Sequence, residues 1–94
     1  MEEKFIAAWQ ENREKALALG VRIRPIEPKN ALKNAKYQLS GSRRSEGFDA
    51  LAAKNALNLS LEALAADRRF TALFTDEEAN NALERLLDAG YFAK

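Results

Sequence analysis

Only one stretch of this sequence, residues 21–28, shows the alternation of apolar and polar side chains that is typical of a β-strand. Val21 and Ile23 alternate with two arginines, and two prolines then end the run because proline has no N–H for a strand ladder. A lone strand leaves its backbone groups unpaired. It must find a partner, pair with a second copy of itself in a homodimer, or remain an extended linker. The sequence therefore predicts an all-α domain with at most one short strand, at residues 21–26.

The rest of the chain favours helices, about five in number, joined by short connections. Glycines such as Gly20 and Gly90 follow predicted helix ends, and serine or threonine precedes predicted starts. Thr75 and Glu78 form a capping box, in which the side chain of each residue bonds to the backbone N–H of the other. The apolar side chains of residues 61–65 and those of residues 70–74 lie on different helix faces, so the sequence predicts a bend near Arg68. The predicted helices are residues 2–19, 29–39, 48–57 with Ser45 as its cap, 61–66 with Ser60 as its cap, and a last one after Thr75 that buries Ala79, Ala82, Leu83, Leu86 and Leu87.

The first predicted helix has a gap in its apolar face. Phe5 and Trp9 form one apolar patch and residues 16–19 form another, but residues 10–15 between them are polar. Either this helix contacts its neighbours only at its two ends, or the aliphatic stem of its arginine covers the gap. Trp9 is expected in the core, and the alternative is that it anchors an interface.

The charge of the chain is nearly balanced overall, at +1, but it is unevenly distributed. Between Lys15 and Arg44, eight basic side chains stand against the single acid Glu27, a net charge of +7. The residues before this segment carry −2 and those after it carry −4. Such a basic segment attracts polyanions through its summed field and through the release of counter-ions.

Residues 21–57, most of which lie in the basic segment, have a recognisable order of elements. The extended stretch Val21-Arg22-Ile23-Arg24-Pro25 comes first and is followed by a helix with an apolar stripe at Leu32 and Ala35. Gly41 ends this helix, a polar turn rich in serine and arginine follows, and a second helix comes after the turn. This order resembles the ribbon-helix-helix family of DNA-binding proteins.

The resemblance implies that the strands of two subunits form an antiparallel ribbon in the major groove of DNA. Arg22 and Arg24 would then read base edges, and the backbone N–H groups after Ser45 would bind a phosphate. Lysines on one face of the helix at 29–39 extend this basic surface, although exposed lysines are more often simply solvated. The predicted DNA-binding residues are Arg22, Arg24, Lys29, Lys33, Lys36, Arg43, Arg44 and Ser45.

The composition argues against several other kinds of site. The chain has no cysteine and no histidine, so disulfides, thiolate chemistry and the commonest general base and metal ligand are excluded. The acids at 76–78 suit the start of a helix and do not converge on one ion. No catalytic motif is visible, so we expect no enzyme, cofactor or metal. With no signal sequence and no membrane-spanning run, we expect a single domain, residues 1–94, in the cytoplasm.

Two functions are therefore expected for this chain. The first is a small DNA-binding regulator or accessory protein that acts as a dimer through its basic central segment. The second is a helical protein-interaction module, such as an inhibitor or adaptor, whose basic face binds an acidic partner. The uneven charge favours both, and Phe5 and Trp9 near the N-terminus are additional candidates for a protein interface.

Overall fold

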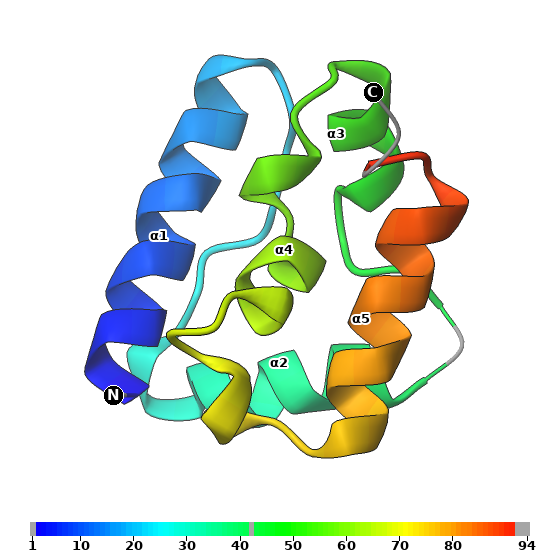
Figure 1. The fold of residues 1–94 in the computed structure, drawn as a ribbon. Helices are drawn as coiled ribbons and strands as arrows, with labels where there is room; N and C mark the ends of the chain where they lie inside the picture. The colour runs from blue at the N-terminus through cyan, green and yellow to red at the C-terminus, as the bar shows by residue number, and fades with distance from the viewer. Residues whose placement is uncertain (1, 42, 92–94) are drawn as a thin grey trace.

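The computed structural model describes residues 2–41 and 43–91, and within these ranges it contains five α-helices, three 3₁₀ turns and no β-strand. The predicted all-α class is confirmed. Figure 1 shows α4 between α1 and α5, with α2 crossing below them and α3 beside the end of α5. The α-helices are α1 (Glu2–Ala18), α2 (Ala31–Ser40), α3 (Phe48–Ala53), α4 (Leu61–Ala66) and α5 (Asp76–Asp88), and the 3₁₀ turns are η1 (Pro28–Asn30), η2 (Leu57–Leu59) and η3 (Thr71–Leu73).

Two hydrophobic clusters hold the helices together. In the first, the ring of Phe5 lies 5.7 Å from that of Trp9, 5.6 Å from that of Phe70 and 5.4 Å from that of Phe74, measured between centroids. The last two rings meet Phe5 edge-on, a favoured arrangement for aromatic pairs. Trp9 is therefore a core residue, as expected. The second cluster contains Ala16, Val21, Phe48, Leu51, Ala56, Leu57, Leu59 and Leu86.

Arg13 fills the polar gap in the middle of α1. Its Nε donates hydrogen bonds to the backbone carbonyls of Ile23, at 2.9 Å, and Arg24, at 3.1 Å. The arginine thus ties α1 to the segment that runs back along it in Figure 1. As a result, α1 packs through its apolar ends and holds the following segment through its centre.

Residues 21–27 form this extended connector, and among the described residues they pair with no strand. The predicted alternation is present, since Val21 is buried and Ile23 is half-buried. At the ends of the connector, Val21 and Glu27 bond to the backbone of the neighbouring turns. In its middle, the hydrogen bonds go to side chains instead of a ladder. The N–H of Arg24 donates to Oε1 of Glu46 at 2.7 Å, and two carbonyls of the connector accept from the arginine of α1.

Three helices end in a Schellman motif, in which a residue with positive φ lets two backbone N–H groups bond to carbonyls of the last turn. Gly20 and Gly90 end α1 and α5 in this way, as predicted. α3 ends at Ala53, short of the predicted residue 57, because Asn55 takes the same left-handed conformation with φ 56°. Asparagine tolerates this conformation better than most residues.

The predicted helix starts are confirmed at two caps and wrong at a third. The Ser60 hydroxyl accepts a backbone hydrogen bond at the start of α4, and the capping box at Thr75 is complete. Ser45 does not cap α3. Its buried side chain bonds to Glu62, and Gly47, with φ 81°, precedes the helix instead. The helix predicted at 29–39 also begins two residues later, because its first residues form the 3₁₀ turn η1.

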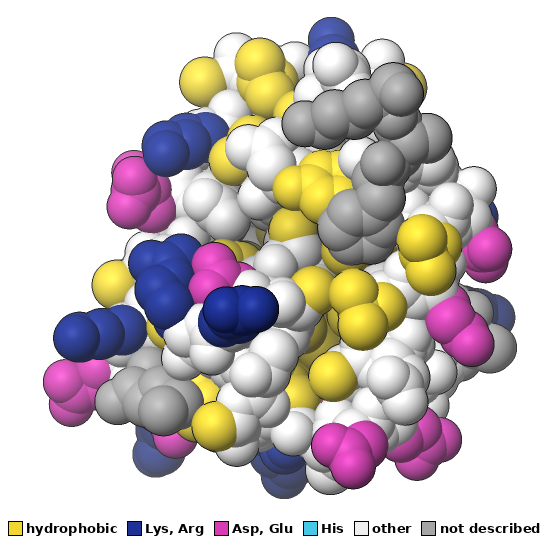
Figure 2. Space-filling view, in the orientation of Figure 1, with side chains coloured by type: hydrophobic (Ala, Val, Ile, Leu, Met, Phe, Trp, Pro, Cys, Tyr) yellow, Lys and Arg dark blue, Asp and Glu magenta, His cyan; other side chains and the backbone are white. Residues whose placement is uncertain are grey.

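α5 buries only part of the predicted face. Ala82 and Leu86 are buried as expected, but Leu83 is 38% exposed and Leu87 is 60% exposed. Glu78 and Arg85 are buried instead, because each has a partner of opposite charge inside the fold. The outer face of α5 is acidic, as the side chains along that edge in Figure 2 show.

The bend predicted near Arg68 is confirmed as a turn after α4. The Asp67 carboxylate accepts hydrogen bonds from the backbone N–H of Arg69, at 2.8 Å, and from its Nη2, at 3.0 Å. The hydrogen bond between the two side chains lowers the pKa of Asp67 below its ordinary 3.8 and raises the pKa of Arg69. This local pair closes the turn.

Candidate functional site

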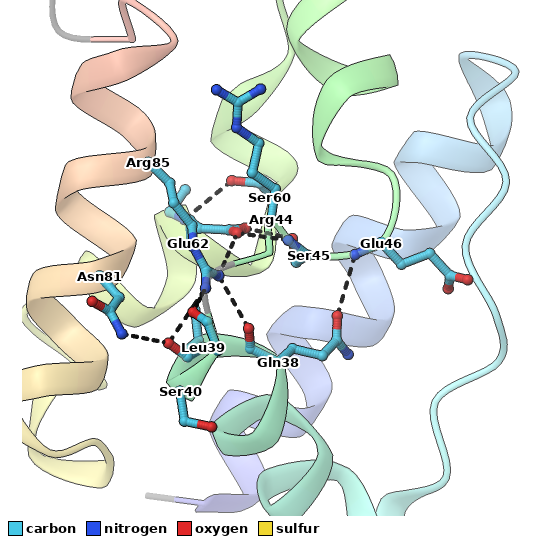
Figure 3. A network of polar contacts seen from close by, with 12 residues as sticks. Gln38, Leu39, Ser40, Arg44, Ser45, Glu46, Ser60, Glu62, Asn81 and Arg85 are labelled. Atoms are coloured by element: carbon cyan, nitrogen blue, oxygen red, sulfur yellow. Dashed lines mark hydrogen bonds and ion pairs between the residues drawn. The ribbon is translucent and has the colours of Figure 1, made fainter.

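A buried polar network joins α2, α4, α5 and the loop between α2 and α3 (Figure 3). At its centre lies Glu62 of α4, which is fully buried. Its carboxylate accepts hydrogen bonds from Nη1 of Arg85, at 3.1 Å, from the backbone N–H of Ser45, at 2.9 Å, and from the Ser45 hydroxyl. Within the described part of the chain, every buried side-chain nitrogen and oxygen has a hydrogen-bond partner, so the buried charges are compensated.

Arg85 also holds the C-terminal end of α2. Its guanidinium donates hydrogen bonds to the carbonyls of Gln38, at 3.1 Å, Leu39, at 3.4 Å, and Gly41, at 2.6 Å. The amide of Asn81 donates a second bond to Leu39, at 2.9 Å. The last carbonyls of a helix lack partners within it. At this helix end, side chains of α5 take the role that the sequence predicted for Gly41, which is extended with φ −88°.

This network fixes the loop that follows α2. Ser45 is buried within the network, whereas Arg43, Arg44 and Glu46 on either side of it are exposed. In Figure 3 the guanidinium of Arg44 points away from the buried carboxylate. Nη1 of Arg44 forms an exposed ion pair with Asp49, at 2.8 Å. The network therefore holds three charged side chains at the surface beside α2.

Tyr37 is the most exposed large hydrophobic side chain in the described ranges, at 78%. It lies between two hollows. One is a shallow depression that Arg43 and Arg44 also line. The other is a cleft of about 240 Å³ between α2 and the connector. We call Tyr37, Lys33 one turn before it, Arg43, Arg44 and this cleft the Tyr37 surface.

Polar side chains form one wall of the cleft. The Glu46 carboxylate bonds to the N–H and to Nε of Arg24, at 2.7 and 3.3 Å, and the Glu46 N–H donates to Oε1 of Gln38, at 3.2 Å. Nε2 of Gln38 in turn donates to Oδ1 of Asn34, at 3.3 Å. These four residues all line the cleft, so the chain of contacts joins the connector to α2 along it.

The eight predicted DNA-binding residues fall into three groups. Three of them form ion pairs with acids that follow the basic segment in the sequence. The pairs are Arg24 with Glu46, Lys36 with Glu78 and Arg44 with Asp49. Ser45 is buried in the polar network. The others are exposed and form no ion pair with the residues that the structure describes; they are Arg22, Lys29, Lys33 and Arg43.

The structure brings only some of these residues together. Four of them line the two hollows beside Tyr37, namely Arg24, Arg43, Arg44 and Ser45. The side chains of Arg22, Lys29 and Lys33 line neither hollow. Lys36 points away from them towards α5.

Lys36 binds the capping box of α5. Its Nζ donates hydrogen bonds to Oε1 of Glu78, at 2.9 Å, and to the carbonyl of Leu73, at 3.0 Å. The N–H of Thr75 donates to the same carboxylate oxygen, at 2.9 Å. Burial raises the pKa of Glu78, but the hydrogen bonds from Thr75 and Lys36 outweigh it, so this pKa lies below its ordinary 4.5.

Glu78→Gln is expected to make the free energy of unfolding fall less steeply as the pH is lowered below about 4.5. Because the folded protein lowers the pKa of Glu78, the stability that the carboxylate contributes is present above about pH 4.5 and is lost as the pH falls through the folded-state value. Urea unfolding at a series of pH values should show a steeper loss below pH 4.5 for the wild type than for the variant. Glu84→Gln, an exposed change on the same helix, is the control. Parallel curves for Glu78→Gln and the wild type would contradict this account.

The ribbon of two subunits stays a prediction. The groups that it would use already have partners inside the chain: the N–H of Arg24 bonds to Glu46, and the carbonyls of Ile23 and Arg24 accept from α1. Of the predicted phosphate-binding N–H groups after Ser45, that of Glu46 donates to Gln38 and that of Phe48 donates to the carbonyl of Ser45. Formation of the ribbon would require these bonds to be exchanged.

Sequence reasoning missed the residues that build this site. Glu62 and Arg85 each interrupt an apolar helix face, and a charged residue in such a position is a signal for a buried pair. Tyr37 lies on the polar face of α2, opposite the stripe of Ala31, Ala35 and Leu39. The signal for it is the residue type, because tyrosine is enriched in the energetically important parts of protein interfaces.

Comparison of the sequence with family models and with curated proteins, and of the fold with solved structures, finds no match. In the described ranges, no helix has the length and apolar character needed to cross a membrane. The same ranges hold no group of three or more acidic, cysteine or histidine side chains suited to a metal ion.

Proposed function

We propose that this protein is a helical protein-interaction module that binds an acidic segment of a partner protein through the Tyr37 surface. The observation that carries the proposal is the exposure of Tyr37, which lines a hollow with Arg43 and Arg44 and lies one helical turn from Lys33. Tyrosine and arginine are enriched in the energetically important parts of protein interfaces. The buried network holds the arginine loop in place before binding, which lowers the entropy cost of association.

The charges on this surface favour a protein partner over a polyphosphate. Arg24 is paired with Glu46 and Arg44 with Asp49, so acids lie beside the arginines. These acids interrupt the continuous positive surface that the closely spaced phosphates of a nucleic acid backbone favour, whereas a peptide with a few carboxylates needs only separate cations. Exposed ion pairs of this kind contribute only about 0–1 kcal/mol, so carboxylates of a partner can replace the acids at little cost.

The double substitution Tyr37→Ala and Arg43→Glu is expected to abolish binding of the partner. Both side chains are exposed, so the change in the free energy of unfolding should stay within about 0.5 kcal/mol. The immobilised wild-type chain should retain a protein from a nuclease-treated extract of the source cells, and the variant should not. Equal retention by both chains, or retention of protein only from an extract that has not been treated with nuclease, would contradict the proposal.

A second candidate is the dimeric DNA-binding regulator. It is favoured by the four exposed cations that form no ion pair in the described part of the chain, namely Arg22, Lys29, Lys33 and Arg43. Four phosphate contacts predict that the logarithm of the binding constant falls against that of the salt concentration with a slope of about −3.6.

Charge reversal at Arg22 and Arg24 should remove such DNA binding without loss of helicity. Titration of labelled duplex DNA at two ionic strengths, with circular dichroism as the folding control, checks both statements. Binding that survives the reversal would show that these arginines are not the readers. A salt-independent affinity would count against the DNA-binding function as a whole.

A further inference from the structure

The cleft beside Tyr37 has the size of a site for one side chain. Its volume of about 240 Å³ lies below the roughly 300–1,000 Å³ of pockets that enclose whole small-molecule ligands. Its apolar lining comes from three parts of the chain, α1, the connector and the residues just before and within α4. The apolar lining residues are Trp9, Ile23, Pro25, Ile26, Leu59 and Leu61.

The apolar walls of this cleft are firmly held. Trp9, Leu59 and Leu61 belong to the two hydrophobic clusters and are each less than 9% exposed. The connector is fastened to α1 through Arg13 and to the loop through Glu46. An apolar group that enters the cleft therefore meets a preformed surface. Because few side chains of this protein need to be ordered on binding, the entropy cost of association is small.

The charges around the cleft indicate what must flank this apolar group. Arg24 lines the cleft, with a side chain that is 89% exposed. Arg43 and Arg44 line the other hollow beside Tyr37. Lys33 lies one helical turn before Tyr37 on α2. Among the described residues that line the cleft, Glu46 is the only acid, and it is already bonded to Arg24. A ligand with carboxylates on both sides of an apolar residue complements this arrangement.

We infer that the cleft binds a single large apolar side chain, aromatic or leucine, of an acidic peptide segment whose carboxylates bind the surrounding arginines. This inference rests on the proposed function and specifies the chemistry of the partner. The acidic residues of the peptide would speed its encounter with the protein and fix its alignment on the surface. The apolar side chain in the cleft, the anchor, would provide most of the affinity.

Trp9 provides the readout, because it is the only tryptophan in the chain and it lines the cleft. The probe is a blocked nine-residue peptide with a central phenylalanine flanked on each side by two glutamates, and the matched probe carries alanine at the centre. The phenylalanine peptide is expected to shift the emission of Trp9 and to bind about ten- to a hundredfold more tightly than the alanine peptide.

Two variants locate the effect. Asn34→Phe places a ring at the cleft and should remove the preference for phenylalanine. Asn30→Phe makes the same change one turn earlier, outside the cleft lining, and should leave the preference intact. Persistence of the preference in Asn34→Phe would overturn the inference.

A third variant separates this inference from the proposed function. Arg43→Glu should weaken both peptides about equally, by roughly tenfold, because it acts on the flanking carboxylates. Equal binding of the two peptides to the wild type, with loss in Arg43→Glu, would overturn the anchor and leave the proposed function standing. Failure of both peptides to bind the wild type at low ionic strength would overturn both.

Discussion

Replacing Arg85 with methionine is expected to lower the free energy of unfolding by about 3–5 kcal/mol, because it leaves the fully buried carboxylate of Glu62 without its counter-charge. The same change removes the guanidinium that donates to the carbonyls of Gln38 and Gly41, whereas Leu39 keeps its bond from Asn81. A chain of this length has a stability of roughly 5–14 kcal/mol, so a large share of it depends on this side chain. Urea unfolding at neutral pH measures the effect.

Two further variants show whether the loss comes from the network. Arg68→Met, at an exposed arginine with no ion pair among the described residues, should change stability by less than about 0.5 kcal/mol. Adding Glu62→Leu to Arg85→Met should restore part of the loss, because the unpaired charge is then removed. A loss below about 1 kcal/mol for Arg85→Met would contradict the role that we assign to this network.

Phe5→Ala is expected to cost about 3–5 kcal/mol, because the ring is fully buried and removing it opens a cavity among three other aromatic rings. Thermal and urea unfolding should both show the loss. Tyr37→Ala is the matched control, since it removes a ring that is mostly exposed and should leave stability within about 0.5 kcal/mol. If Tyr37→Ala were as destabilising as Phe5→Ala, Tyr37 would be a structural residue and its exposure would not indicate a binding surface.

The sequence predicted the parts of this fold that local signals determine. A glycine with positive φ at Gly20 and at Gly90, and the capping box of Thr75 with Glu78, set helix ends through residues a few positions apart. The central polar region of α1 was also recognisable, and Arg13 fills it. The helix ends and the polar pattern of α1 depend only on neighbouring residues, whereas the bonds of Arg13 reach residues ten and eleven positions away.

The rest depends on contacts between residues far apart in the sequence. Glu62 and Arg85 are separated by 23 positions and Ser45 lies 17 positions before Glu62, so neither helical periodicity nor cap rules could pair them. Lys36 was predicted to face solvent with the other lysines, but Glu78 binds it from 42 positions away.

The sequence predicted only part of the candidate site, because the rest of it also depends on contacts between distant residues. Arg24, Arg43 and Arg44 do line hollows beside α2. The sequence could not show that Tyr37 separates these hollows, because their walls come from four distant segments.

Chemical-shift mapping by NMR tests the central claim most directly, namely that the Tyr37 surface is where this protein binds a partner. The ¹⁵N-labelled chain would be titrated at low ionic strength with the glutamate-flanked phenylalanine peptide. We predict that the largest changes fall on the amides of Tyr37, Gln38 and residues 43–46, with smaller changes along the connector. Changes concentrated on the outer face of α5 or on α1, with Tyr37 and residues 43–46 unmoved, would contradict the account.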